Sequence, residues 1–292
     1  MAVIRVGACS WADRSLVRDG SFYPRKSMRA ADRLRFYASH LDVVEVSSTH
    51  WFPPTPEQSA QWAARTPPGF RFDVQAWSLF TGHGTIPESL WPDLQDEVKP
   101  DARDRRRLYA DHLSLDARAE AWLRFRHALH PLAGTGRLGS VVLRLPSWVR
   151  PGRTATAMLE AARQWLQPWP VAVELANHRW HDGDQCEETL AQLEDLDLAL
   201  VCVDAARATP VVAATTGLAV VRFAGRRTGR WSWPYRYAPA ELAPWLDRIR
   251  ALDEGADDVH VLFANCHADD AVTGALWMRD LLVPRPEALT LF

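Results

Sequence analysis

Cysteine is scarce in this sequence, and long apolar runs are missing. The 292 residues contain four cysteines, and no two of them form a Cys-x-x-Cys pair. This spacing argues against a zinc ribbon or a dithiol redox motif and indicates reduced thiols. No apolar run approaches the roughly 20 residues of a membrane-spanning helix, and no charged leader with a long apolar core begins the chain. We therefore expect a soluble, cytoplasmic protein.

Lysine is nearly absent, and the net charge is small. Only two of the 34 basic residues are lysines, Lys26 and Lys99. The formal net charge of −2 and the pI near 6.6 give no global attraction to nucleic acid or to an anionic membrane. Because arginine suits bidentate contacts with carboxylate or phosphate, any anion-binding surface must be a local cluster of arginines.

Several familiar catalytic motifs are also missing. No Gly-x-Gly-x-x-Gly follows the first apolar run, so a dinucleotide-binding fold is disfavoured. The chain has no His-Glu-x-x-His, the spacing of many zinc hydrolases, and no Gly-x-Ser-x-Gly, the usual setting of a nucleophilic serine. The chemistry must therefore be sought in residues that lie apart in the sequence.

Short β-branched runs alternate with amphipathic segments along most of the chain. Hydrophobic residues make up 47% and charged residues 24%, a balance typical of a globular protein with a full core. The predicted strands span 3–8, 43–48, 70–76, 139–145, 171–175, 198–203, 218–224 and 259–264. The predicted helices span 31–41, 55–65, 117–132, 154–166, 186–196, 238–252 and 269–282. The gap between the sixth and seventh strands is too short for a clear helix. Eight strands that otherwise alternate with helices favour a (β/α)8 TIM barrel, formed as a single domain over 1–292, with an open doubly wound sheet as the alternative.

One long segment interrupts this alternation between the third and fourth strands. It covers about 78–116 and is rich in proline, aspartate and arginine. A long insertion after a barrel strand is a common place for lids and substrate-binding loops. A variable surface excursion is the alternative interpretation.

Charged residues fall at the carboxyl ends of the predicted strands, where active sites of this fold lie. The carboxylates are Glu45, Glu174 and Asp204, and the arginines are Arg144 and Arg222. This set suits an acid/base carboxylate flanked by guanidinium groups that hold an anion. The alternative is a compensated cluster of buried ions with no chemical role.

The sequence has 14 tryptophans, some of them beside the predicted strand ends. Trp11 and Trp180 follow predicted strands, and Trp231 and Trp233 alternate with arginines in the segment 225–236. Flat rings at such positions can stack on sugars or nucleobases, although packing against the barrel would also explain them.

Several motifs together resemble one known family. They include GACSW at 7–11, SFYP at 21–24, VEVSSTHW at 44–51, VAVELANHRW at 171–180 and VLFANCHADDAVTGA at 261–275. In order and spacing they resemble the DUF72 (YecE-like) proteins over almost the whole chain. The resemblance implies a TIM barrel of uncertain biochemical function.

The resemblance also implies a set of signature residues. These are Gly7, Trp11, Tyr23, Glu45, Thr49, Glu174, Trp180, Asp204, Arg222 and Asn265. The chain departs from the family pattern at Ser47, Gln75, Ala176 and Ala224, where polar or aromatic groups of the presumed site are replaced. These departures leave open whether catalysis is retained.

We expect an enzyme that acts on an anionic substrate containing a sugar or nucleotide, by hydrolysis or a related acid/base reaction. Glu45, Glu174 and Asp204 are the predicted catalytic residues. The predicted substrate contacts are Trp11, Tyr23, Thr49, Arg144, Trp180, Arg222, Asn265, Trp231 and Trp233. The alternative is a non-catalytic module that binds single-stranded nucleic acid or a phospho-ligand, with the segment 225–236 as its contact surface.

No cofactor is required by this interpretation. A divalent metal site remains open, with Glu45, Glu174 and Asp204 joined by one histidine out of His50, His178 and His267.

Overall fold

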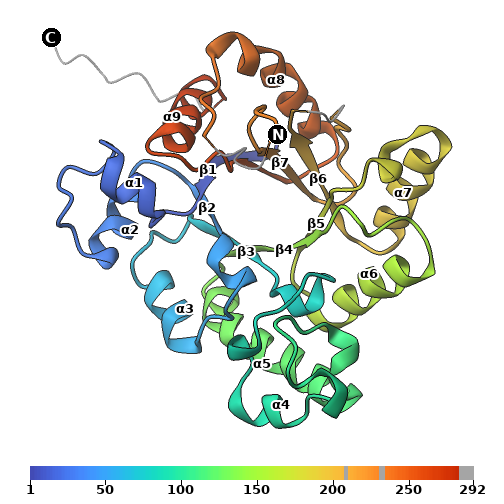
Figure 1. Ribbon diagram of the computed structural model, residues 1–292. Helices are drawn as coiled ribbons and strands as arrows, with labels where there is room; N and C mark the ends of the chain where they lie inside the picture. The colour runs from blue at the N-terminus through green and yellow to red at the C-terminus, as the bar shows by residue number, and fades with distance from the viewer. Residues whose placement is uncertain (207–209, 230–233, 283–292) are drawn as a thin grey trace, which may run out of the picture. The chain divides into compact units, whose positions relative to one another are not determined.

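The strands form a closed parallel barrel in a computed structural model that describes residues 1–206, 210–229 and 234–282. Neighbouring strands follow the sequence order from β1 to β8 (Figure 1). The strands are β1 (Val3–Cys9), β2 (Val43–Val46), β3 (Arg71–Gln75), β4 (Leu138–Leu145), β5 (Val171–Leu175), β6 (Ala199–Asp204), β7 (Leu218–Phe223) and β8 (Asp258–Phe263). The predicted fold class is confirmed, and each predicted strand corresponds to an observed one.

Nine helices accompany the strands in the described part of the chain. They are α1 (Arg14–Asp19), α2 (Ala30–Ala38), α3 (Pro56–Ala63), α4 (Pro92–Asp96), α5 (Leu115–Gly134), α6 (Arg153–Leu166), α7 (Gly183–Asp195), α8 (Pro239–Ala251) and α9 (Asp270–Leu282). The seven predicted helices are all present. The sequence prediction missed α1 and α4, which are too short to show a full amphipathic period. No helix of the described residues is long and apolar enough to cross a membrane.

The contacts divide the chain into two compact units. The first comprises Met1–Glu45 and Cys202–Phe292, and the second comprises Val46–Val201. The predicted single domain over the whole chain stays a prediction. Each unit contains its own cluster of charged residues at strand ends.

The first unit contains β7, β8 and β1, which pair in parallel, with α9 packed against β1 and β8. Its core includes the stacked rings of Phe223 and Phe263, whose centroids are 4.6 Å apart, and the edge of Trp245 against Phe223. Gly7 in β1 permits close pairing with β2, because a Cβ at this position would lie 1.8 Å from the Val43 carbonyl oxygen. These contacts fix the carboxyl ends of the strands in this unit.

The second unit contains the parallel strands β3, β4 and β5. Their residues are almost all buried, as expected for parallel strands covered on both faces. In Figure 1, α5 and α6 lie outside β4 and β5, and α5 contacts β4 while α6 contacts β5. The start of α3 is fixed by a capping box between Thr55 and Gln58, with Pro56 at the first helical position.

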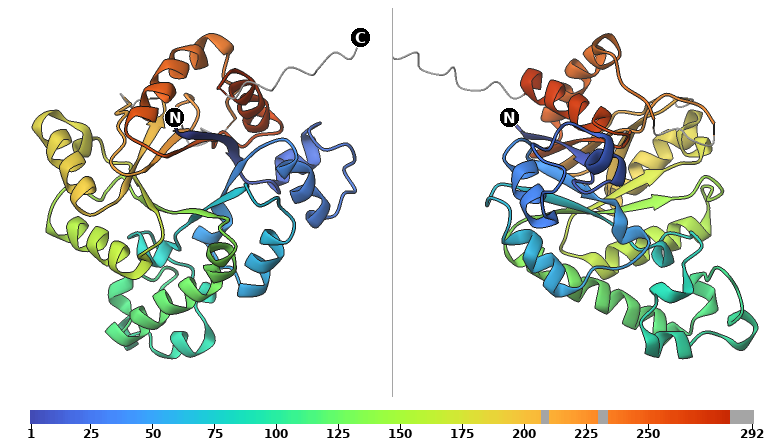
Figure 2. Two further views of the ribbon diagram at one scale, coloured as in Figure 1. Left: turned by 180° about the vertical axis from the view of Figure 1, so that it is seen from behind. Right: turned by 60° about the vertical axis from the view of Figure 1, so that its left-hand side comes forward.

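The insertion between β3 and α5 contains α4 and otherwise only short 3-10 turns. Two isolated antiparallel bridges, Thr85 with Leu108 and Val98 with Leu113, connect the irregular segments of the insertion. Figure 2 shows the insertion next to the N-terminal end of α5. Ser114 caps that helix by accepting a hydrogen bond from the Ala117 amide.

Candidate functional site

Four of the predicted charged residues occupy the same position within their strands. Glu45, Arg144, Glu174 and Arg222 are each the second-to-last residue of β2, β4, β5 and β7, and Asp204 is the last residue of β6. All five therefore lie at the carboxyl ends of strands, as the sequence predicted. Glu45, Asp204 and Arg222 belong to the first unit, and Arg144 and Glu174 belong to the second.

In the first unit, Glu45 and Arg222 form a buried bidentate pair. Arg222 Nε donates to Glu45 Oε2 at 3.1 Å, and Arg222 Nη2 donates to Glu45 Oε1 at 3.3 Å. The two side chains are 0% and 7% exposed. Because β8 and β1 separate β7 from β2, the two side chains meet across the interior of this unit rather than along one strand pair.

A buried thiol accompanies this pair. Burial, followed by the nearby Glu45 carboxylate, raises the pKa of Cys9 well above its usual value. The Cys9 thiol therefore stays protonated and bonds to the carboxylate. Cys266 contacts the backbone carbonyl of Cys9, and burial raises its pKa to about 12. Both thiols are thus unreactive at neutral pH.

Asp204 is enclosed by donors of the first unit. It accepts hydrogen bonds from Arg226 Nε at 2.9 Å and Nη2 at 2.6 Å, from the Tyr237 hydroxyl at 2.8 Å and from Trp245 Nε1 at 2.9 Å. Asp204 as a whole is 1% exposed. Four donors occupy the lone pairs of this carboxylate, which joins β6 to the segment after β7 and to α8.

The other predicted contacts of the first unit are also buried. The Tyr23 hydroxyl donates to the Trp11 carbonyl oxygen, and both residues are less than 10% exposed. Asn265 Nδ2 donates to the Tyr235 carbonyl oxygen at 2.6 Å. Asn265 Oδ1 is buried and has no hydrogen-bond partner among the residues that the structure describes. Trp231 and Trp233 lie outside those residues.

The second unit contains a more open pair, Arg144 with Glu174. The two residues are register partners on the neighbouring strands β4 and β5, so their side chains project from the same face. Arg144 Nε lies 3.1 Å from Glu174 Oε1, and the side chains are 40% and 7% exposed. The arginine therefore touches both the buried carboxylate and solvent.

Two histidines and a tryptophan lie in the same unit. The ring centroids of His50 and His83 are 4.8 Å apart, and those of His83 and Trp148 are 5.6 Å apart. Burial, followed by the positive charges of His50 and Arg144, lowers the pKa of His83 to about 4. His83 is therefore neutral at neutral pH. Trp148 is 62% exposed and offers an open ring face.

The hydrogen bonds of His83 indicate its tautomer. The Thr81 hydroxyl donates to the Ser78 carbonyl oxygen at 3.1 Å, so Thr81 Oγ1 is left to accept from His83 Nδ1 at 2.9 Å. This assignment places the ring proton on Nδ1 and leaves Nε2 as a base. Sequence analysis missed His83, because it lies in the irregular insertion, and its position between Gly82 and Gly84 was the only signal of an ordered turn.

Two further predicted contacts of the second unit are engaged in packing. Thr49 Oγ1 lies 2.7 Å from the carbonyl oxygens of both Val46 and Gln75, and its residue is 1% exposed. Trp180 Nε1 donates to the Val149 carbonyl oxygen at 3.1 Å, and its ring is buried. These groups shape the strand ends but do not present open faces.

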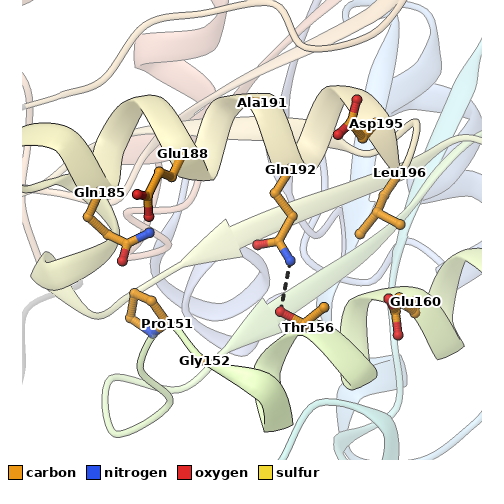
Figure 3. Close-up of a pocket in the computed structure, with 10 residues that line it drawn as sticks. All are labelled: Pro151, Gly152, Thr156, Glu160, Gln185, Glu188, Ala191, Gln192, Asp195 and Leu196. Atoms are coloured by element: carbon orange, nitrogen blue, oxygen red, sulfur yellow. Dashed lines mark hydrogen bonds between the residues drawn. The ribbon is translucent and has the colours of Figure 1, made fainter.

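A separate polar groove of about 680 Å³ lies between α6 and α7 (Figure 3). Glu160, Glu188 and Asp195 surround it, and Gln192 Nε2 donates across it to Thr156 Oγ1 at 2.8 Å. Most of the lining residues belong to α6 and α7, and none of them is a predicted site residue. Within the described ranges, no group of three or more histidine, cysteine, aspartate or glutamate residues is arranged to hold a metal ion.

Comparison with known proteins identifies the family. Residues 5–290 match the family described as "Protein of unknown function DUF72". The chain belongs to the DUF72 family. It is 25% identical to the UPF0759 protein YunF of Bacillus subtilis over 300 residues, which cover 96% of this chain and 95% of that protein. The family resemblance predicted from the sequence is thereby confirmed.

Solved structures of DUF72 proteins share the fold. The structure of a DUF72 family protein from Enterococcus faecalis matches with a TM-score of 0.76 and 24% identity, over 97% of this chain and 98% of the other. A DUF72 family protein from Thermotoga maritima matches with a TM-score of 0.73 and 22% identity, over 96% and 99% of the two chains. These similarities support the barrel and leave the activity of the family to be established.

Proposed function

We propose that this DUF72 protein is an acid/base enzyme that acts on an anionic substrate containing a sugar or nucleotide, by hydrolysis or a related reaction. Glu174 is the proton donor or acceptor, and Arg144 holds the anion. The observation that carries this proposal is the partial exposure of Arg144, whose side chain is 40% exposed while it contacts the buried Glu174 carboxylate. A guanidinium in that position can bind a carboxylate or phosphate and keep it beside the acid/base group.

His83 and Trp148 support the same assignment. A neutral imidazole with an unprotonated Nε2 can accept a hydrogen bond from a substrate hydroxyl, and the low pKa keeps that nitrogen unprotonated at neutral pH. The exposed Trp148 ring, 5.6 Å from His83, can stack on a sugar or a base. An acid/base pair, an anion contact and a stacking surface thus come from one unit of the chain.

Glu45 and Asp204 take a different place in this proposal. Their carboxylates are buried and bonded by Arg222 and by four donors, respectively, so we assign them to the stability of the first unit. Their predicted catalytic role stays a prediction, as do the open metal site and the cytoplasmic location.

The nucleic-acid-binding alternative receives less support from the described arginines of the segment 225–236. Two of the three described arginines are paired: Arg226 with Asp204 and, at a longer distance, Glu241, and Arg236 with Asp270. Arg227, the third, is exposed. Cations that are already paired contribute little to phosphate binding. Filter binding of single-stranded DNA and RNA over a salt series tests this alternative, since phosphate contacts give a steep salt dependence.

The proposed function is tested by a thermal-shift screen of sugar phosphates and nucleotides, followed by turnover assays of the compounds that stabilise the protein. We expect Glu174→Gln to lower kcat by about 10²–10⁴-fold while ligand binding persists. Arg144→Ala should instead abolish the stabilisation by the ligand. Glu160→Gln, a carboxylate of the groove between α6 and α7, is the matched control. The proposal fails if Glu174→Gln and Arg144→Ala leave both binding and turnover unchanged.

A further inference from the structure

A second cavity lies beneath the insertion in the second unit. Its volume is about 760 Å³, within the range of sites that bind small molecules. Three parts of the chain form its walls: the turn after β3, the last turn of the insertion with the first turns of α5, and α6. The lining residues include Phe80, Tyr109, Arg118, Trp122, Ala157 and Met158.

The walls of this cavity are fixed without a ligand. The bridge between Val98 and Leu113 and the hydrogen bond from Lys99 Nζ to the Asp111 carbonyl oxygen, 2.7 Å long, hold the last turn of the insertion. Gly82 lies at φ +78°, and a Cβ there would approach Met158 Cε to 3.2 Å. A side chain at this position would thus be strained and would press on the cavity wall. Binding would require little ordering of the protein.

The lining favours a flat apolar ligand. Phe80 and Trp122 stack with centroids 3.6 Å apart and planes at 10°, which makes a rigid aromatic wall. Tyr109 is 40% exposed at the rim, and the flexible thioether of Met158 faces the cavity from α6. Aromatic walls bind planar groups by stacking, and methionine adapts to ligand shape.

The charge at the rim favours an anionic group on that ligand. Arg118 lines the cavity in the first turns of α5, and its Nε and Nη2 both donate to the Leu113 carbonyl oxygen at 3.3 Å. Arg118 Nη1 has no hydrogen-bond partner among the residues that the structure describes. The nearby Asp111 side chain is 78% exposed, so water screens its charge. Among the residues that line the cavity, the half-buried Arg118 is the arginine and the well-solvated Asp111 is the carboxylate.

We propose that this cavity is a second ligand site, which binds a planar aromatic or similarly flat apolar molecule bearing one carboxylate, sulfonate or phosphate. The apolar body lies against Phe80, Trp122 and Met158, and the anion accepts hydrogen bonds from Arg118 Nη1. The site is separate from the proposed acid/base pair, and it does not depend on that function.

Anilinonaphthalene sulfonate is a suitable probe, because it combines a flat apolar body with one anion. The full-length protein is titrated with this dye and, in parallel, with the same anilinonaphthalene lacking its sulfonate. We expect saturable binding of one dye per chain. The dye without sulfonate should bind at least about tenfold more weakly, the usual effect of losing a charge-assisted hydrogen bond.

Two matched substitutions on α6 locate the dye. Ala157→Phe fills the cavity and should weaken binding by at least about tenfold, as expected when a ligand loses its space. Gln164→Phe adds the same ring at an exposed position of α6 that does not line the cavity, and it should leave the affinity unchanged. Arg118→Gln should make the two dyes bind equally. Arg144→Ala should not alter dye binding, which separates this site from the proposed active site.

Three results would overturn the proposal. If Ala157→Phe binds the dye as tightly as the wild type does, the dye lies elsewhere. Equal affinities of the wild type for the two dyes would remove the role of Arg118, and this comparison needs no variant to fold. Binding that does not saturate would mean adsorption to the surface rather than occupation of a cavity.

Discussion

The two arginine–glutamate pairs of this protein use the same residue types at the same strand position, but their surroundings differ. Glu45 and Arg222 are bonded through two nitrogen atoms and are almost completely buried. Arg144 Nε lies 3.1 Å from Glu174 Oε1, and the arginine side chain is 40% exposed. A pair closed to water is suited to holding strands together, whereas a pair that is open on the arginine side can also receive an anion.

The difference follows from which strands contribute the partners. Arg144 and Glu174 come from adjacent strands, so both side chains rise side by side from one face. Glu45 and Arg222 are separated by two strands and must reach across the interior, where water is excluded. Because desolvating a charge is costly, the buried pair persists only while both partners remain.

The largest expected effect is the loss of one partner of the buried pair. Arg222→Met or Glu45→Met should each lower the free energy of unfolding by about 3–5 kcal/mol, because an uncompensated charge is left in the core. Chemical denaturation monitored by tryptophan fluorescence measures this change.

The double variant Glu45→Met with Arg222→Met is the decisive control. Since two apolar side chains of similar length leave no buried charge, it should recover most of the loss. If the single variants have free energies of unfolding within about 1 kcal/mol of the wild type, this pair contributes no more to stability than an exposed ion pair does. The contrast between the two pairs would then be wrong.

Substitution of Asp204 should cause the next largest loss of stability. Like that of Glu45, its carboxylate is buried and accepts hydrogen bonds, here from four donors. Asp204→Asn removes the charge that Arg226, Tyr237 and Trp245 share, and we expect a loss of about 2–3 kcal/mol. The emission of Trp245 should also shift as its indole loses an acceptor. Asp247→Asn is the control, since that side chain is 92% exposed in its pair with Arg250 and should cause no measurable change. Equal stabilities of the two variants would contradict the structural role of Asp204.

The open pair should contribute less to stability than the buried pair. Arg144→Ala is expected to lower the free energy of unfolding by about 1–2 kcal/mol, because water can enter the space left by the partly exposed arginine and solvate the Glu174 carboxylate. The same variant should lose the response to anionic ligands. A stability loss as large as that of Arg222→Met would show that both pairs are structural, and the proposed active site would then lose its main support.

The fold could be predicted closely from the sequence, because parallel strands buried on both faces leave short β-branched runs that are easy to recognise. All eight strands were placed within a few residues, and the helix α5 was placed two residues short at each end. The short helices α1 and α4 were missed. They depend on local capping, such as the Asp13 side chain accepting from the Ser15 and Leu16 amides, rather than on a repeating apolar pattern.

The candidate site could be predicted only in part. Position at the carboxyl end of a strand identified Arg144 and Glu174, but the sequence could not distinguish this pair from Glu45 with Arg222. That distinction depends on solvent exposure, which strand order and side-chain packing decide. His83 was not predicted, because its contacts with His50 and Trp148 join residues 33 and 65 positions away through an irregular insertion.

The smallest expected effect is a pH dependence from His83. Its pKa is lowered from 6.5 to about 4 in the folded protein, so the unfolded chain binds the proton more readily. The stabilising contribution of the neutral ring is complete above pH 6.5 and is lost as the pH falls from 6.5 toward 4. His83→Asn should therefore flatten the dependence of the unfolding free energy on pH in this interval.

An NMR titration of the His83 ring measures its pKa and tests why that pKa is low. Burial is the main reason for the low pKa, and the charge of His50 is the next. His50→Asn should thus raise the pKa of His83 by a smaller amount than full exposure would. A ring that titrates near pH 6.5 in the wild type would mean that water reaches it freely. His83 would then be protonated in mildly acidic solution, and the open pair would lose its neutral partner base.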